Sequence, residues 1–341
     1  MNSNPQIGNI GETRLIRLIE KLILKKTGKV LLNDDSFFYN LKEESLEHHI
    51  VLNSDMLVSS TDAPPQMSAY QIGRKSVIMN VSDLIVKGVK PKGIIISLGL
   101  PRLLREVDFI ELITGIIDYC IKFNLDYIGG DINETKELII NPTVFGFKKP
   151  SEIIYRKGIK PGDILIANNK FGLTGVGFDI LLNKKDNLED FKKYKRSIKS
   201  VLEPEISGIE AFILSERKIS VSGIDSSDGL LKSLLDLMLT NPNLGFKIFF
   251  NEELIDSEAF QYADEFNISL EEVVLNGGEE FIHLFVIDLE DYITARKLIR
   301  VKGGKIIKIG QVISDKGIFI LKDGKVNELS GHGFEHFSKP D

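Results

Sequence analysis

The stretch GRKSVIMNVSDLIVKGVKP, residues 73–91, predicts a helix from about Tyr70 to Lys87 that is apolar over most of its circumference. Such a helix is buried on several sides instead of lying on the protein surface. Its polar residues form one narrow stripe at helical spacing: Ser76, Asn80, Asp83 and Lys87. A buried carboxylate is costly unless it is paired or bound to a metal ion, so Asp83 is either in an ion pair with Lys87 or a ligand. Of the two, we favour the ligand.

Strands and helices alternate on both sides of this helix. The hydrophobic pattern predicts helices at 11–26 and 107–123, strands at 49–53, 126–129 and 138–148, and a buried strand at 93–99. The second half alternates helical patterns with strands at 164–167, 219–224, 246–250 and 281–287, and ends in a hairpin at Asp323-Gly324. We expect a mixed α+β or α/β fold. Turns at Pro150 and Lys160-Pro161-Gly162 favour two domains, 1–155 and 156–341.

The composition is that of a globular protein and argues against several classes of function. The chain has 341 residues and a net charge of −6, so no nucleic-acid surface is predicted, and the Lys-rich segment 191–200 is expected to be a solvated face. No apolar run reaches the ~20 residues of a membrane span, and the N-terminus lacks a secretory pattern, so we expect a cytoplasmic protein. The single cysteine, Cys120, is expected in the core.

Carboxylates recur directly after apolar strands or at predicted helix starts, where the sites of α/β proteins gather. They are Asp34, Asp35, Asp55, Asp131, Asp225 and Asp228. For the last two, simple capping of helix amides is an equally good explanation. The chain has no P-loop, no dinucleotide-binding glycine motif and no zinc-type histidine spacing, and His283 has the pattern of a structural strand residue. Oxygen ligands without His or Cys favour Mg²⁺, and so many separate carboxylates favour several ions.

Taken in order, these motifs resemble the thiamine-monophosphate kinase family, within the PurM-like superfamily of proteins related to aminoimidazole ribonucleotide synthetase. The resemblance covers almost the whole chain. It rests on GETRLIRLI, Asn33-Asp34-Asp35, Ser54-Asp55-Met56-Leu57, the helix at 73–91, YIGGD, TGVGFDILL, IDSSDGL, NGGEEF and GFEHF. Each motif alone is weak, and their order and spacing make the resemblance specific.

The resemblance implies direct, in-line transfer of the γ-phosphoryl group of ATP to thiamine monophosphate, assisted by Mg²⁺ and without a catalytic side chain. It implies Mg²⁺ ligation by Asp35, Asn53, Ser54, Asp55, Asp83, Asp131, Asp225 and Asp228. The implied ATP contacts are Gly130, Asp131, Arg156 and Ser227, and the implied substrate contacts are Glu279 and Phe334. Asp62 stands where many members carry a substrate-contacting His, so it is the third candidate substrate residue.

The resemblance also implies an architecture. It implies an N-terminal domain with a mixed sheet flanked by helices, which pairs into a β-barrel in a homodimer, and a C-terminal sandwich-like α/β domain that completes the ATP and substrate site. Asn33 replaces Gly and Glu280-Phe281 replaces Asp-Tyr, and with Asp62 these departures bear on the substrate. The alternatives are a different kinase or an amidine-forming ATPase acting on another phosphorylated substrate, and a nucleotide-binding module without catalysis.

Overall fold

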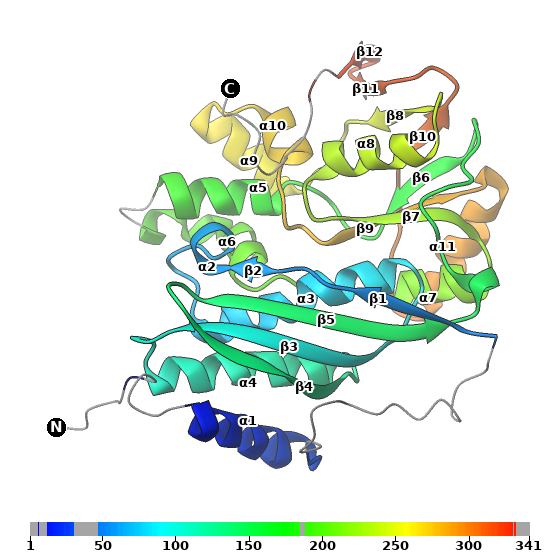
Figure 1. The fold of residues 1–341 in the computed structure, drawn as a ribbon. Helices are drawn as coiled ribbons and strands as arrows, with labels where there is room; N and C mark the ends of the chain where they lie inside the picture. Colours follow the sequence, from blue (N-terminus) through cyan, green and yellow to red (C-terminus); the bar gives the residue numbers. More distant parts are fainter. Residues whose placement is uncertain (1–5, 7–11, 31–46, 185–187, 330, 332–341) are drawn as a thin grey trace. The chain divides into compact units, whose positions relative to one another are not determined.

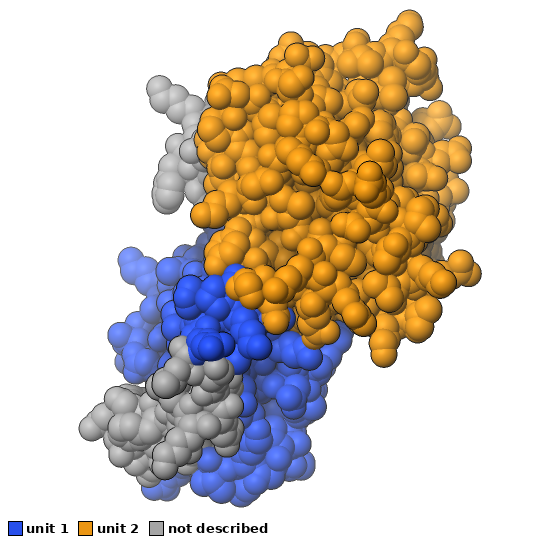
Figure 2. All heavy atoms as spheres, turned by 90° about the vertical axis from the view of Figure 1, so that its right-hand side faces the viewer, with its two compact units in different colours: residues 1–84, 89–150 blue, residues 85–88, 151–341 orange. Residues whose placement is uncertain are grey.

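The computed structural model describes residues 6, 12–30, 47–184, 188–329 and 331, which form a mixed α+β protein with two sheets (Figure 1). The chain divides into two compact units (Figure 2). Unit 1 comprises residues 1–84 and 89–150, and unit 2 comprises residues 85–88 and 151–341. None of the helices in the described ranges is long and apolar enough to cross a membrane.

Among the described residues, unit 1 contains a five-stranded sheet in the order β1 (His49–Asn53), β5 (Ile139–Lys148), β3 (Pro91–Pro101), β4 (Asp126–Thr135), with β2 (Leu57–Val58) also pairing with β5. Only β3 and β4 run parallel, because helix α4 (Glu106–Lys122) carries the chain across between them. The pairs that involve β5 are antiparallel. Unit 1 also contains the short helix α2 (Ser59–Asp62), and the 3₁₀ turn η3 (Pro150–Glu152) starts at the last residue of unit 1 and continues into unit 2.

Helices cover one face of this sheet. Helix α3 (Ala69–Val86) crosses α4 at two glycines, and α1 (Glu12–Thr27) lies against α4 (Figure 1). A Cβ on Gly73 would lie 2.1 Å from the Leu112 carbonyl oxygen, and a Cβ on Gly115 would lie 2.1 Å from that of Tyr70. The two helix backbones therefore touch, which only glycine permits at these positions.

The other face of the sheet is open within unit 1. Ile94 and Ile96 of β3 are fully buried, whereas Ile95 between them is 40% exposed. The prediction of a buried strand at 93–99 therefore holds for one face of the strand and is wrong for the other. Buried and exposed side chains alternate along it, as in a strand of a sheet that is covered on one side. The sequence could not predict the exposure of Ile95, because it has the same side chain as its buried neighbours.

Among the described residues, unit 2 contains a seven-stranded sheet, with only β8 and β11 parallel. Its order is β12 (Lys325–Glu328), β11 (Ile318–Lys322), β8 (Gly245–Phe249), β10 (Ile307–Ile313), β6 (Ile164–Ala167), β9 (Ile282–Ile287), β7 (Ser220–Ser226). The hairpin at Asp323-Gly324 is confirmed: Lys322 pairs with Lys325, and both turn residues have positive φ angles of 51° and 75°.

The helices of unit 2 pack against one face of the sheet, and side chains from both form a large apolar core. They are α5 (Leu173–Phe178), which continues as the π-helix η4 (Asp179–Asn183), and η5 (Leu188–Tyr194), α6 (Lys195–Leu202), α8 (Leu230–Thr240), α9 (Ser257–Phe266) and α10 (Leu270–Leu275). Helices α7 (Ile209–Glu216) and α11 (Tyr292–Val301) pack on each other, and η6 (Leu289–Asp291) precedes α11.

Most sequence-based elements are confirmed within a few residues. Helix α3 is buried along most of its length, with Val77, Ile78 and Val81 fully inaccessible, and Cys120 is in the core. The Lys-rich segment is a solvated face as predicted: its four lysines and Arg196 are all exposed, and Arg196 also pairs with the carboxylates of Asp256 and Glu258. Strand β4 continues well past its predicted end at Gly129.

Candidate functional site

Two carboxylates of unit 1 lie against one amide group. Asn53 is the last residue of β1, and its side-chain Nδ2 donates to Asp55 Oδ2 at 3.0 Å and to Asp83 Oδ2 at 2.9 Å. Asp55 lies in the turn between β1 and β2, whereas Asp83 lies on α3. The structure thus brings together three of the predicted ligands from a strand end, a turn and a helix.

Helix α3 also holds the turn that carries Asp55. The fully buried side chain of Asn80 accepts from the Asp55 backbone N–H at 2.8 Å and donates to the Asp55 carbonyl at 3.1 Å. Sequence reasoning placed Asn80 in the polar stripe but gave it no role. The signal was present, since a fully buried amide requires hydrogen-bond partners.

Ser54 and Asp131 belong to the open face of the same sheet. The Ser54 hydroxyl contacts the Asn141 side chain at 3.3 Å and that of Thr143 at 3.0 Å. Asn141 is the register partner of Ser97, and Ser97 is the partner of Asp131, so these three side chains lie in one row across β5, β3 and β4. Asp131 is exposed on this row.

Gly130 is held against a neighbouring strand. A Cβ at this position would lie 1.8 Å from the Ile96 carbonyl oxygen, so no other residue fits beside β3 without moving the backbone. The glycine therefore fixes how closely β4 approaches β3 directly before Asp131.

Asp62 is bonded within its own turn. Its carboxylate accepts from the Val58 backbone N–H at 2.6 Å, and its carbonyl oxygen accepts from the fully buried ammonium group of Lys75. An acidic residue at this position is therefore explained by a local hydrogen bond, in which its carboxylate binds the backbone N–H of the residue before helix α2.

The carboxylates of unit 2 follow strand β7. Asp225 is 4% exposed, and its register partner on β9 is His283, which is fully buried. Burial and the nearby Lys87 ammonium group lower the pKa of His283 to about 3, so it is neutral. The N-cap position of α8 is occupied by Gly229, with a φ of 93°. Asp225 lies in β7 and Asp228 directly precedes Gly229, so neither is the N-cap residue itself.

The loop 276–281 (NGGEEF) is bonded to the turn that follows β7. The Glu279 N–H donates to the Ser227 carbonyl at 2.5 Å, and the Phe281 N–H donates to that of Ser226 at 3.0 Å. Glu279 and Phe281 both have positive φ angles, of 59° and 48°. Such conformations are strained in non-glycine residues and persist only where the surroundings impose them. Ser227 and Glu279, predicted to contact different ligands, are thereby neighbours.

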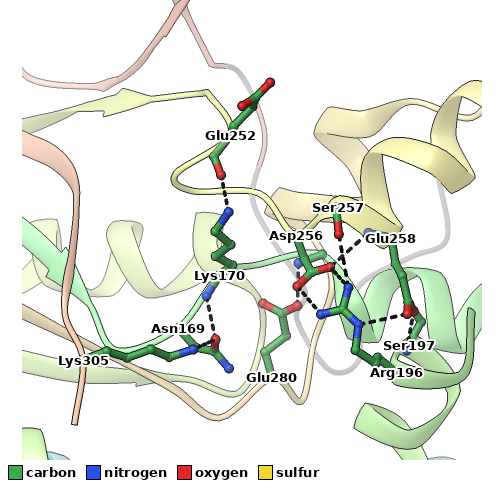
Figure 3. A network of polar contacts seen from close by, with 11 residues as sticks. Asn169, Lys170, Arg196, Ser197, Glu252, Asp256, Ser257, Glu258, Glu280 and Lys305 are labelled. Atoms are coloured by element: carbon green, nitrogen blue, oxygen red, sulfur yellow. Dashed lines mark hydrogen bonds and ion pairs between the residues drawn. The ribbon is translucent and has the colours of Figure 1, made fainter. Parts of the chain in front are cut away.

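Glu280 points into the protein and meets the start of α5. Figure 3 shows the Glu280 side chain. One of its carboxylate oxygens accepts from the Gly172 N–H at 2.6 Å and the Thr174 N–H at 3.4 Å, and the other is buried without a hydrogen-bond partner among the described residues. Burial raises the pKa of Glu280 to about 8, although these hydrogen bonds act to lower it. Sequence reasoning noted this residue only as a departure from the family pattern.

The Arg196 ion pairs shown in the same view belong to the framework of unit 2 (Figure 3). The guanidinium of Arg196 contacts both carboxylate oxygens of Asp256, at 2.6 and 2.9 Å, and that of Glu258 at 3.0 Å. Asp256 also caps α9 by accepting from the Glu258 N–H. This network ties α6 to the start of α9 while the Arg196 side chain stays exposed.

The remaining predicted residues are not brought together by the described structure. Arg156 is half-buried in unit 2, where its carbonyl oxygen accepts from Asn241 Nδ2 at 2.7 Å. Asp35 and Phe334 lie outside the described residues. Within the described ranges, no group of three or more His, Cys, Asp or Glu side chains is arranged to hold a metal ion. Asn53, Ser54, Asp55, Asp83 and Asp131 belong to unit 1, and Asp225, Ser227, Asp228 and Glu279 belong to unit 2.

Comparison with known proteins identifies the family. Residues 33–147 match the family model described as AIR synthase related protein, N-terminal domain. The chain is 31% identical to the thiamine-monophosphate kinase of Nitrosopumilus maritimus, over 97% of its own length and 100% of that relative. The chain belongs to the thiamine-monophosphate kinase family. Another thiamine-monophosphate kinase, from Methanocaldococcus jannaschii, is 30% identical and covered over 99% of its length.

Solved structures share the fold. AaThiL complexed with AMPPCP and TMP matches with a TM-score of 0.74 and 25% identity, over 98% of this chain and 100% of that one. Thiamine-monophosphate kinase from Stenotrophomonas maltophilia has a TM-score of 0.77 at 21% identity, over 91% and 96% of the two chains. The predicted PurM-like fold is confirmed, and the described part of this one chain contains no closed barrel.

Proposed function

We propose that this chain transfers the γ-phosphoryl group of ATP to the phosphate of thiamine monophosphate, forming thiamine diphosphate and ADP. The observation that carries the proposal is identity along the whole chain to thiamine-monophosphate kinases, at 31% for the Nitrosopumilus maritimus protein. The match to AaThiL complexed with AMPPCP and TMP supports both substrates, since AMPPCP is a non-hydrolysable form of ATP.

The donor atoms of unit 1 fit Mg²⁺. The Asp55 and Asp83 carboxylates lie against the Asn53 amide, and the Ser54 hydroxyl follows directly in the chain, so every candidate ligand offers oxygen. Bound Mg²⁺ would supply positive charge to offset repulsion between two anionic reactants. In this proposal the full ligand set is Asp35, Asn53, Ser54, Asp55, Asp83, Asp131, Asp225 and Asp228.

The remaining residues bind and orient the reactants. Gly130, Asp131, Arg156 and Ser227 are proposed to contact ATP, and Asp62, Glu279 and Phe334 the acceptor. The acceptor phosphate is already ionised at neutral pH, so in-line attack needs no general base and no phosphorylated enzyme. The hydrogen bond between the Glu279 N–H and the Ser227 carbonyl supports the idea that the acceptor contact and the nucleotide contact lie on two neighbouring segments that are bonded to each other.

The proposal assigns a role to each predicted domain. Residues 1–155 would bind metal and ATP, and residues 156–341 would complete the ATP and acceptor site.

The proposal also includes a homodimer. Ile50, Leu52 and Ile95 are 54%, 58% and 40% exposed, and their register partners put them on the open face of the unit 1 sheet. Pairing that face with a second copy would cover apolar surface that is otherwise in water.

An acceptor panel tests the proposed function. We expect ADP release with Mg²⁺ and ATP to require thiamine monophosphate, and to stay at background with other phosphate esters or with substrates of amidine-forming ATPases. Release with a different acceptor, or with none, would reject thiamine monophosphate as the substrate. Nucleotide binding without ADP release on any acceptor would support a binding module.

A further inference from the structure

Among the residues that the structure describes, the turn that carries Asp55 has no sheet partner of its own. Strand β1 ends at Asn53 and β2 begins at Leu57, and both pair with β5, so the residues between them lie outside the ladder. A backbone group left without a partner is free to move or is costly when buried. Something other than the sheet must therefore fix the position of Asp55.

Asn80 supplies both backbone bonds that the sheet does not. Its Oδ1 accepts from the Asp55 N–H at 2.8 Å, while its Nδ2 donates to the Asp55 carbonyl at 3.1 Å and to the Ser76 carbonyl at 3.1 Å. Both amide hydrogens and the amide oxygen are thus engaged. Reversing the amide would place like groups together at all three contacts, so the network fixes its orientation.

The same helix carries Asp83. Asn80 and Asp83 are three residues apart on α3, and positions with that spacing share a face. Helix α3 therefore presents one carboxylate directly and holds the other through the Asp55 backbone. The Asn53 amide, which contacts both carboxylates, can bridge them only while this arrangement holds.

We propose that Asn80 is a positioning residue that sets the separation of the Asp55 and Asp83 carboxylates, and thereby the affinity of unit 1 for a divalent cation. The proposal rests on the metal role given to these two carboxylates under the proposed function. Asn80 itself does not touch the cation. It acts through the Asp55 backbone, from a helix whose position is fixed by its buried apolar side chains.

Asn80→Ser separates this role from a merely structural one. The new hydroxyl can bond to the Ser76 carbonyl one turn back in the helix, as serine commonly does, but is too short to replace both bonds to Asp55. The matched control is Ser76→Ala. Ser76 is buried on the same helix, and within the described ranges its hydroxyl donates to the Gly73 carbonyl alone, so this variant removes a buried polar group and leaves Asp55 in place.

The test uses the full-length protein and Mn²⁺ as the probe, without nucleotide. We expect Asn80→Ser to weaken Mn²⁺ binding, measured by electron paramagnetic resonance, by roughly 10- to 100-fold, as loss of a residue that orients a metal ligand does. Hydrogen exchange of the 54–57 backbone amides should accelerate in the same variant. Ser76→Ala should leave both measurements at their wild-type values.

Unchanged Mn²⁺ affinity in Asn80→Ser, equal weakening in Ser76→Ala, or no Mn²⁺ binding by wild type would each overturn the proposal. If Asn80→Ser does not fold, hydrogen exchange is measured on Asn80→Asp instead. This variant keeps an acceptor for the Asp55 N–H, so we expect the amide of residue 55 to stay protected while the other amides of 54–57 exchange faster. Equally fast exchange of all these amides would overturn the proposal. A wild-type protein that binds Mn²⁺ but makes no thiamine diphosphate would instead refute the proposed function and leave the role of Asn80 standing.

Discussion

At the residue scale, the proposed chemistry depends most on the Asp83 carboxylate. Asp83→Asn keeps the size of the side chain and removes its charge, so we expect the chain to fold and its turnover to fall by roughly 100-fold or more, as for other losses of a charge-stabilising group. Product formation at saturating ATP and Mg²⁺ measures this. The control is Asp108→Asn on α4, which breaks the ion pair of Asp108 with Arg105, the residue before the helix. Near-normal turnover in Asp83→Asn would remove this residue from the site.

Glu280 should make stability depend on pH. Because burial raises its pKa from 4.5 to about 8, the folded chain keeps a proton that the unfolded chain releases over this range. Its contribution to stability is therefore fully present below pH 4.5 and is lost as the pH rises toward 8. We expect Glu280→Gln to remove this loss, which is at most roughly 1.4 kcal/mol per pH unit.

Urea unfolding of wild type and Glu280→Gln between pH 5 and 9 checks this expectation. The control is Glu271→Gln, a solvent-accessible carboxylate that pairs with Lys322. Parallel stability curves for wild type and Glu280→Gln would show that Glu280 is charged in the folded protein at neutral pH.

At the element scale, the crossing of α3 and α4 depends on glycine. A Cβ on Gly115 would lie 2.1 Å from the Tyr70 carbonyl oxygen, so Gly115→Ala must push the helices apart although alanine favours helix. We expect a loss of about 1–3 kcal/mol of unfolding free energy, as for other overpacked cores. Thr114→Ala, at the neighbouring half-buried position, should cost less. A Gly115→Ala variant as stable as wild type would mean that the crossing is looser than described.

Elements were predictable where one physical signal dominates. The circumference of α3 is apolar, and its predicted bounds, Tyr70 to Lys87, lie within one residue of the observed ones. The bounds of β1 and β6 were also predicted, since turns flank short apolar runs. The length of β4 was not predicted, because four of its five residues after Gly130 are polar and the segment is extended through its pairing with β3. Tertiary pairing of that kind leaves no local pattern.

At the scale of the whole molecule, the site was predictable in type and only partly in arrangement. Asp55 and Asp83 were identified as ligand candidates, and the structure brings them to one amide. The clamp from Asn80 to Asp55 could not be derived, because which turn faces the stripe depends on how β1 packs on α3. The same holds for Glu280 and α5, which lie more than a hundred residues apart.

The open face of the unit 1 sheet carries the prediction about assembly. Leu52 is 58% exposed there, so Leu52→Lys should turn a dimer into a monomer in sedimentation equilibrium, because a buried ammonium group without a partner is costly. Leu103→Lys is the control, since Leu103 is 70% exposed in the turn after β3 and outside the sheet. A wild-type monomer would contradict the proposed dimer, and a dimeric Leu52→Lys variant would place the interface elsewhere.

The central claim, transfer of phosphate to phosphate, is tested most directly by phosphorus NMR of the wild-type chain with ATP, Mg²⁺ and thiamine monophosphate. We predict that the thiamine monophosphate signal is replaced by the two coupled signals of thiamine diphosphate as ATP becomes ADP, and that no inorganic phosphate is formed. Without Mg²⁺ the thiamine monophosphate signal should stay unchanged. An unchanged thiamine monophosphate signal, with ATP intact or hydrolysed to ADP and inorganic phosphate, would contradict it.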